Sequence, residues 1–589
     1  MKNLIKICSI FFITGLLVSC EEDFLEAPAK SSMDESTIFS TVGLARGAVD
    51  GILEPIGQTN SYRGRFLPYY GFNTDVEYNY SSNSTGPNTD LVNYGAQANN
   101  STMNTENNAW AMMYQGIERA NIVIRGLRTY GDPEPGSELG QLLGEALTYR
   151  AFYYADLMKA HGDVQARFEP INAETIYLPK TSRDTIYKRL IADLGEASTL
   201  VPWPNASMSV ERINKAFVKG FRARLAMAAS GFQQYPDGIR RSNDPELSVQ
   251  NMYQLALDEA RDVINSGTAR LNPSYEAFWR SYNQENLNAG GESLWELPFA
   301  AGRGRVLFSF AVRHRSVDQF TAQPRGGTAG PTPFVWYDFD ENDTRREVTA
   351  VPYQWGNAVD GIAKQELQNI ETWYFGKYRY EWMNRIVTST NDDGVNWIYM
   401  RYAEVLFIAA EAANELEGPA AAAPYLKEIR RRAFPSAQHA QKVETYVDAL
   451  TSKEAMFNAL VEEHKYEFTG EMDRKQDLIR WNLLGAKLEE AKVKLANLQN
   501  RTGEYADVPT TLYYKYEDDG YTLDIYGLNR GETTNPGPEW SAQNWNQSLE
   551  RMINTLHQPG VDVDSRQFWP IWQVFIDASN GLLVNDYGY

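Results

Sequence analysis

The sequence predicts an all-α fold in which a body of tetratricopeptide-like helical hairpins carries an irregular, loop-rich insertion. Three observations favour this fold. Apolar residues recur at helical spacing over much of the chain, small residues line several of the expected helices, and one long segment between helical regions has little periodicity. Helices of this kind cannot bury an apolar face alone, so they are expected to stack on one another as in helical-repeat proteins.

The clearest hairpin lies at residues 398–432. Its first helix is predicted to bury a stripe of aromatic and small residues, namely Tyr399, Tyr402, Ala403, Leu406, Ala410 and Ala413. The chain breaks at Gly418-Pro419, after which the helical pattern resumes. Three arginines at 430–432 close the second helix, where the helix dipole favours cations.

The start of the chain is expected to direct the protein to a membrane. Two lysines precede an apolar run at 10–18 that is too short to span a bilayer, and Leu-Val-Ser-Cys follows. This pattern predicts a lipoprotein signal peptide over residues 1–19. Cys20 is the predicted site of lipid attachment, at the start of a leader that spans 20–33.

After the leader, residues 34–589 are predicted to form one domain. Helical repeats are expected mainly at 34–54, 107–267 and 397–484. Within the second region the expected helices cover 110–127, 144–164, 183–198 with Ser182 or Asp184 as the cap, 212–230 and 250–265. Two segments rich in turn-forming and aromatic residues, at about 62–106 and 271–396, are predicted to be irregular and to face the ligand.

Composition excludes several functional classes. Cys8 leaves with the signal peptide and Cys20 is the other cysteine, so the mature chain is expected to have no disulfide. The net charge of −20 argues against nucleic acid as a partner. The five histidines show no metal-ligand spacing, and nucleophile-elbow, phosphate-loop and dinucleotide motifs are absent from the sequence. We therefore predict no metal site, no cofactor and no enzymatic activity.

Conspicuous charges are interpreted as structural. Carboxylates on the expected helices are predicted to pair between helices with nearby arginines; these are Glu404, Glu411, Glu463 and Glu467, with Arg401, Arg430 and Arg480. Asp338, Asp340 and Asn342 resemble part of a calcium loop. However, the segment lacks the glycine and the final carboxylate that an EF-hand requires, so we predict a turn there.

Several blocks resemble one protein family and occur in its order. They are RYAEVLFIAAEAANE with LKEIRRRA in the hairpin, GEALTYRAFYYADLMKAHGDV at 144–164 and EEHKYEFTGEMDRKQDLIRW at 462–481. These blocks resemble signatures of the SusD/RagB family of outer-membrane nutrient-binding lipoproteins. Departures from the family pattern at His464 and at Met472–Arg474 predict local rearrangement of an ion-pair network.

The resemblance implies a SusD-like fold and a function in nutrient uptake. It implies a lipid-anchored protein on the surface of the outer membrane that captures oligosaccharide or polysaccharide. Delivery to a SusC-type TonB-dependent transporter, without a catalytic step or a cofactor, is also implied. Such a protein would serve polysaccharide utilisation.

Sugars present C–H faces that stack on aromatic rings and hydroxyls that bind polar side chains, so aromatic residues with polar neighbours are the candidate ligand site. The candidates come from the two irregular segments; they are Asp75, Tyr78, Tyr80, Asn83, Trp279, Tyr282, Trp295, Phe320 and Trp336. A single aromatic residue at any of these positions is more often part of the core than a ligand platform, because burial favours large rings.

Other functional classes stay open at this point. A protein of the same architecture could bind peptide for import, or could be a scaffold subunit of the transporter that binds no ligand. A glycoside hydrolase would need two carboxylates at a defined separation in one cleft. The sequence does not measure that separation.

Replacement of Cys20 tests the predicted lipid anchor. Cys20→Ala should release the protein from the membrane fraction, because the residue that carries the lipid is lost. The measurement is fractionation of cells that lack the transporter partner. If the variant stayed with the membranes of those cells, the anchor would not be at Cys20.

Overall fold

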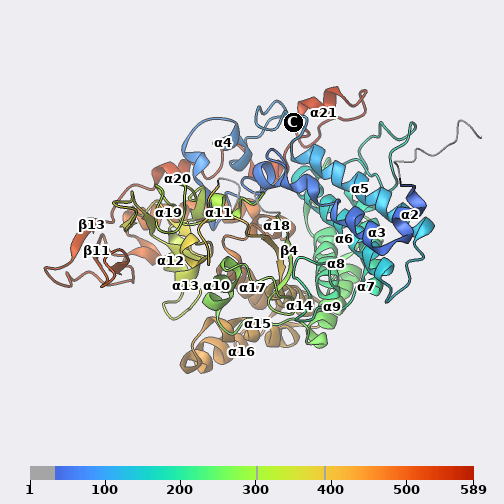
Figure 1. Ribbon diagram of the computed structural model, residues 1–589. Coiled ribbons are helices and arrows are strands. Elements are labelled where there is room, and N and C mark those ends of the chain that lie inside the picture. The colour runs from blue at the N-terminus through green and yellow to red at the C-terminus, as the bar shows by residue number, and fades with distance from the viewer. Residues whose placement is uncertain (1–32, 300–302, 390–392) are drawn as a thin grey trace, which may run out of the picture.

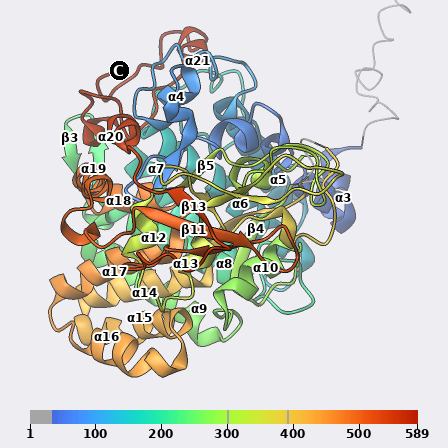
Figure 2. The same ribbon diagram turned by 90° about the vertical axis from the view of Figure 1, so that its left-hand side faces the viewer.

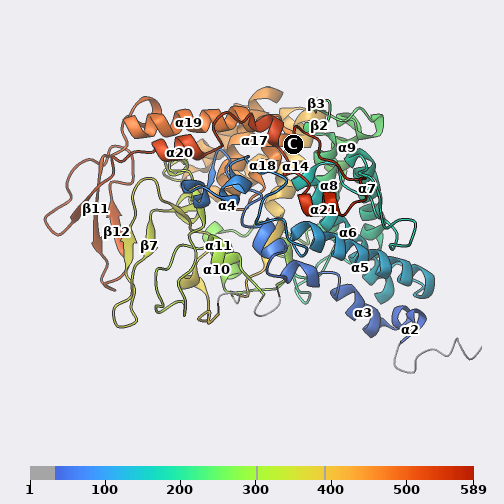
Figure 3. The same cartoon turned by 90° about the horizontal axis from the view of Figure 1, so that it is seen from above.

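The computed structural model describes residues 33–299, 303–389 and 393–589. This part of the chain is mainly helical, which confirms the predicted fold class (Figure 1). Helices from the first half of the chain stack at one end, and the irregular insertion and a C-terminal sheet lie at the other, as the view from above also shows (Figure 3). The predicted signal peptide, Cys20 and the leader up to residue 32 lie outside the described residues.

Antiparallel helices of the first half form a layer in which consecutive members from α5 to α9 pack against each other. The helices are α2 (Glu35–Ser40), α3 (Val42–Asp50), α5 (Ala109–Tyr130), α6 (Glu138–His161), α7 (Arg183–Leu200), α8 (Lys215–Ser230) and α9 (Val249–Ser266). The single helix predicted at 34–54 is instead two, because the backbone is extended at Thr41. The predicted cap at Ser182 is confirmed, since its side chain accepts a hydrogen bond from the backbone N–H of Asp184.

Glycine lets α5 approach two neighbouring helices closely. A Cβ atom on Gly116 of α5 would lie 2.2 Å from ring carbons of Tyr153 in α6. A Cβ atom on Gly126, also in α5, would lie 2.2 Å from a ring carbon of Phe39 in α2. Any side chain at these positions would push the helices apart, so glycine sets the spacing of this layer.

The central hairpin has the predicted break but a different start. Helices α14 (Tyr402–Leu416) and α15 (Pro419–Ala433) flank Gly418, and in Figure 2 they lie beside α16 (Tyr446–Asp448). The predicted helical start at 398 is wrong, because Trp397–Arg401 forms strand β10, antiparallel to β4 (Ser293–Leu297). The aromatic and β-branched residues at 397–399 favour an extended strand.

The two irregular segments consist of short elements joined by loops. The first contains η2 (Glu54–Gly57), η3 (Tyr62–Phe66), β1 (Glu77–Asn79), η4 (Tyr80–Asn83) and α4 (Pro87–Val92). The second contains α10 (Tyr275–Asn283), β4, α11 (Val306–Phe310), β5 (Ala329–Pro331), α12 (Phe334–Asp338), α13 (Arg346–Thr349), β6 (Ala350–Val351), β7 (Tyr353–Trp355), β8 (Gln365–Leu367), β9 (Tyr374–Phe375) and η6 (Tyr380–Trp382). Residues 66–79 are buried, so much of the first segment is interior chain.

The C-terminal region adds elements that the sequence analysis did not predict. Helices α17 (Lys453–Phe468) and α18 (Arg474–Arg480) are followed by α19 (Leu484–Asn500), which lies beyond the predicted end of the repeats at 484. A three-stranded antiparallel sheet then has the order β12-β11-β13; its strands are β11 (Thr511–Tyr516), β12 (Leu523–Tyr526) and β13 (Ser541–Asn544). Other elements include the hairpin β2 (Gln233–Tyr235) and β3 (Gly238–Arg240), and helices α20 (Glu550–Thr555) and α21 (Gln573–Asp577).

A buried network of ion pairs joins the insertion to the helical body. The Glu467 carboxylate of α17 lies 3.1 Å from Arg345 Nη1 and 3.0 Å from Arg401 Nη1, and it also pairs with Arg432 of α15. Glu471 extends the network, 2.6 Å from Arg401 Nε and 2.6 Å from Lys377 Nζ. The four cationic side chains and Glu467 are at least nine-tenths buried, so each charge depends on its partners.

The predicted pairing of helix carboxylates is confirmed for three of the four. Glu411 binds Arg480, Glu463 binds Arg430, and Glu467 binds Arg401. Glu404 instead binds Arg224 of α8, a partner that the sequence did not indicate. The predicted turn near Asp340 is also present, because the backbone N–H of Asp343 donates to the Asp340 carbonyl at 2.9 Å. Asp338 binds Lys465 and Lys494.

Enlarging a small buried residue tests the packing of the hairpin. Ala410→Leu should lower the free energy of unfolding by about 1–3 kcal/mol, because Ala410 is fully buried and the new atoms would overpack the interface. The measurement is urea denaturation. Ala420→Leu, at an exposed position of α15, is the matched control and should change little. Equal stability of Ala410→Leu and the wild-type protein would contradict the packing described here.

Removing the central carboxylate tests the ion-pair network. Although burial opposes it, the charges of Arg432, Arg401 and Arg345 hold the pKa of Glu467 well below its usual range. Glu467→Gln should lower the free energy of unfolding by about 3–5 kcal/mol at neutral pH, because buried guanidinium groups lose their counter-charge.

The same variant has a characteristic pH dependence. Because the folded pKa of Glu467 lies below the unfolded value, its contribution is complete above about pH 5 and declines as the pH falls further. The difference from wild type in urea denaturation should therefore shrink in acid. Glu454→Gln, exposed on the same helix, is the control. A difference that did not vary with pH would show that the loss has another cause.

Candidate functional site

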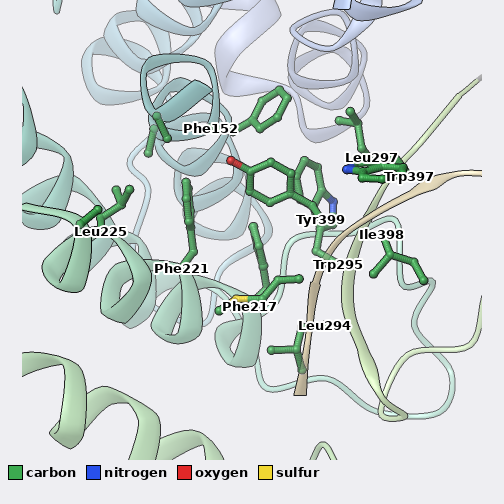
Figure 4. Packing of buried hydrophobic residues seen from close by; sticks show 14 of the residues in the cluster. Phe152, Phe217, Phe221, Leu225, Leu294, Trp295, Leu297, Trp397, Ile398 and Tyr399 are labelled. Carbon is green, nitrogen blue, oxygen red and sulfur yellow. The ribbon is translucent and has the colours of Figure 1, made fainter. Parts of the chain in front are cut away.

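Most of the aromatic residues predicted to bind ligand lie inside the molecule. Trp279, Trp295 and Tyr78 are fully buried, and Tyr282 is 5% exposed. Figure 4 shows Trp295 within a cluster that includes Tyr399 and other aromatic side chains. The indole N–H of Trp295 donates to the Glu211 carbonyl at 3.0 Å. The rings of these residues are packed against protein, so they present no open face for a sugar.

The predicted polar residues of the first irregular segment also have structural partners. Asp75 is buried against Arg474, with an oxygen-to-nitrogen distance of 2.7 Å. The Tyr78 hydroxyl lies 2.7 Å from Asn83 Oδ1, and the Tyr80 hydroxyl donates to the Trp373 carbonyl at 2.6 Å. Tyr80 and Asn83 remain half-buried, as does Phe320 of the insertion. The structure therefore does not gather the nine predicted residues into one site.

One predicted residue, Trp336, is 5% exposed and lines an open cleft of about 380 Å³. The cleft lies between the insertion and the C-terminal sheet. Its walls come from α10, α12, α13, the β6–β7 segment, η6 and β12. Its apolar lining consists of Val348, Ala350, Val351, Pro352, Leu523, Ile525 and Leu528. This volume falls within the range of small-molecule binding sites.

Arginine side chains stack on the tryptophans of the cleft. The Arg346 guanidinium lies 4.4 Å from the ring centroid of Trp336, while Arg280 and Arg379 lie 4.5 and 4.4 Å from that of Trp382. Such contacts hold a guanidinium in place by cation–π attraction and leave its N–H edge available for hydrogen bonds. The cleft therefore offers oriented donors above aromatic rings.

Hydrogen bonds fix two of these arginines. Arg379 donates to the Tyr353 hydroxyl at 2.9 Å and to the Gly376 carbonyl at 2.7 Å. Arg346 donates to Asn529 Oδ1 at 3.0 Å, while its Nε, also buried, has no partner among the described residues. Burial lowers the pKa of Arg346 and raises the pKa of Tyr353 to about 12. At neutral pH Tyr353 is therefore a neutral hydroxyl that can donate or accept.

The chemistry of the cleft favours binding over reaction. Its lining contains guanidinium, amide and phenol groups but no serine, cysteine or histidine. Four carboxylates also line it: Glu276, Glu347 and Glu517 are exposed, and Asp524 is half-buried. The Glu276 carboxylate lies 2.7 Å from Arg280 Nε. In the described part of the chain no three His, Cys, Asp or Glu side chains are placed to hold a metal ion. No described helix has the length and hydropathy to cross a bilayer.

Sequence reasoning missed most residues of the cleft. Arg346, Arg379 and Trp382 lie within the predicted irregular segment, but nothing in their spacing links them to Trp336. Leu523 and Asn529 are far along the chain and join the cleft only through the C-terminal sheet. One sequence signal could have found part of the cleft, namely the arginine pair in Asp-Thr-Arg-Arg-Glu at 343–347. Adjacent residues at the start of a short helix face different sides, so one arginine can point into the interior while the other faces a cleft.

Comparison with known families identifies the chain. A family model described as "SusD family" matches residues 275–589, and one described as "Starch-binding associating with outer membrane" matches residues 23–227. The chain belongs to the SusD family. Neither description names a catalysed reaction.

Individual proteins that are similar to this SusD-family chain are also described as SusD-like. It is 24% identical to SusD-like protein P25 of Formosa agariphila over 515 residues, covering 81% of this chain and 90% of the relative. SusD-like protein P2 of the same organism is 26% identical over 405 residues, covering 66% and 74%.

Solved structures show the same fold. A SusD homologue from Bacteroides thetaiotaomicron superposes with a TM-score of 0.71 at 18% identity, covering 95% of this chain and 99% of that one. Surface glycan-binding protein A of the same organism, in complex with laminarihexaose, gives 0.59 at 18% identity, covering 92% and 99%. At these identities the likeness concerns the fold.

Proposed function

We propose that this SusD-family chain is a non-catalytic glycan-binding protein of the outer-membrane surface, and that the cleft lined by Trp336, Arg346 and Arg379 holds the sugar. The observation that carries the proposal is the stacking of the three arginines on two tryptophans inside one open cleft. Fixed guanidinium groups can donate two hydrogen bonds to neighbouring hydroxyls of a sugar, and the apolar lining suits its C–H face.

The cellular setting of the proposal rests on the family. A lipid anchor at Cys20 would keep the protein at the membrane, and a SusC-type transporter would receive the captured glycan. The family description of outer-membrane association supports this setting. Among the predicted ligand residues, Trp336 lines the proposed cleft, and the half-buried Tyr80, Asn83 and Phe320 remain candidates for contacts beyond it.

The test is a binding screen of the soluble chain that begins at Glu21. Affinity electrophoresis against plant, host and microbial polysaccharides should show retardation by at least one polymer. Product analysis of the same mixtures should show no cleavage. Retardation accompanied by cleavage would favour a glycoside hydrolase. A screen in which no polymer retards the chain would count against glycan capture and would favour peptide binding or a scaffold role.

A variant of the cleft tests the proposed site. Arg346→Ala should weaken binding of the retained polysaccharide at least tenfold, or about 1.4 kcal/mol, because a buried, oriented donor is lost. Isothermal titration calorimetry measures the affinity, and circular dichroism confirms folding. Arg431→Ala, which removes an exposed arginine of α15, should bind as the wild type does. Equal affinities of both variants would place the sugar outside this cleft.

A further inference from the structure

A second group of arginines lies outside the proposed sugar cleft and forms no ion pair with the described residues. Its members come from three separate segments, η3, the chain before α11 and the chain before β5; they are Arg63, Arg65, Arg303, Arg305 and Arg325, and we call them the arginine cluster. None of the five forms an ion pair within 4 Å with a carboxylate of the described chain. Elsewhere in the protein, buried arginines such as Arg345, Arg401 and Arg474 each bind carboxylates.

The members of the cluster are close enough to interact. A Cβ atom on Gly64 would lie 3.9 Å from Arg305 Nη1, which places that guanidinium against η3. Burial together with the charges of Arg305 and Arg303 lowers the pKa of Arg63 to about 10. Mutual repulsion of this kind destabilises the folded protein unless an anion offsets it.

Guanidinium groups without hydrogen-bond partners also favour a bound anion. Arg63 is 2% exposed, and its Nε and Nη1 atoms have no hydrogen-bond partner among the described residues. Arg325 is 4% exposed, and its Nη2 atom also lacks one within the described chain. A buried guanidinium without partners is costly, because it has lost its hydration without replacement. Such donors are therefore suited to a ligand that supplies several acceptor oxygens.

One buried carboxylate, Asp393, lies near the cluster, and its Oδ1 atom has no hydrogen-bond partner among the described residues. Asp393 accepts a hydrogen bond from the backbone N–H of Phe308 at 3.1 Å. Burial raises the pKa of Asp393 to about 6, so it supplies at most one negative charge to five arginines. The cluster thus keeps a local positive charge on a protein whose net charge is −20.

The cluster can be reached from solvent and has an aromatic component. Arg303 is exposed and lines a cavity of about 510 Å³, the one member of the cluster to do so. The other walls include Phe299 and Tyr149 and the carboxylates Asp50, Glu54 and Glu211. The Arg305 guanidinium lies 4.1 Å from the ring centroid of the half-buried Phe308. A charged group on a sugar could therefore bind the guanidinium groups while the sugar ring contacts Phe308.

We propose that the arginine cluster is a second ligand site, which binds the anionic substituent of an acidic glycan, either a sulfate ester or a uronate carboxylate. Guanidinium groups match the oxygen geometry of both groups and bind them in bidentate fashion. The identity of the ligand as a glycan rests on the proposed function, whereas the anion site itself rests on the arginines.

The direct test uses inorganic sulfate as the probe. Sulfate should raise the melting temperature of the soluble chain more than chloride at equal ionic strength, by about 1–2 °C, because it binds the folded state. The double variant Arg65→Gln/Arg305→Gln should lose this extra shift. The matched control Arg270→Gln/Arg566→Gln removes two other arginines without ion pairs in the described chain, and should keep it. General salting-out by sulfate acts on all three proteins alike.

Matched polymers then distinguish the two sources of the anion. Dextran sulfate is compared with dextran, and polygalacturonate with its methyl ester, by isothermal titration calorimetry. We expect the charged member of one pair to bind at least tenfold tighter than its neutral partner, and the double variant to lose that preference. A preference in the first pair assigns a sulfate ester, and in the second a uronate.

The outcomes separate the two proposals. If the double variant keeps the full sulfate shift, or keeps a wild-type preference for the charged polymer, the anion site is overturned even where the chain binds neutral glycan in its cleft. If sulfate stabilises the wild type and control but not the double variant, the anion site is supported. In that case, failure to bind glycan of either charge would overturn the glycan function alone.

Discussion

The buried ion pairs around Glu467 are the constraint on which the rest of the structure depends. Placing charges in the interior costs several kcal/mol per ion, and this cost is offset only where each charge has close partners of opposite sign. Glu467 meets this condition through Arg345, Arg401 and Arg432, which come from the insertion, strand β10 and helix α15. The network therefore holds an irregular segment against a helical body, to which the two-stranded sheet of β4 and β10 also joins it.

The proposed cleft is a direct consequence of this attachment. Arg345 points into the network while its neighbour Arg346 lies on Trp336 in the cleft. Lys377 binds Glu471 in the network, and two residues later Arg379 lies on Trp382. In both cases a short stretch of chain presents one cation to the interior and another to the cleft. The ion pairs of the first cation fix the backbone, and the fixed backbone holds the second cation in the cleft. The arginines of the cleft are therefore positioned although they lie on short, irregular elements.

The helical layer could be predicted from sequence because periodicity and caps are local signals. The break at Gly418 and the cap at Ser182 needed only their neighbours in the chain. The ligand residues could not be predicted in this way, because a tryptophan such as Trp295 is equally suited to a core and to a sugar platform. Which of these roles a tryptophan takes depends on contacts with distant parts of the chain; Trp336, for example, donates its indole N–H to the Leu528 carbonyl, 192 residues away.

A crystal structure of the soluble chain with a bound oligosaccharide tests the central claim most directly. The oligosaccharide should be a fragment of whichever polysaccharide the wild-type chain retains. The account predicts sugar density between α13, η6 and β12, with hydroxyls within hydrogen-bond distance of Arg346 and Arg379. Density at another surface, with the cleft between Trp336 and Trp382 empty, would contradict it.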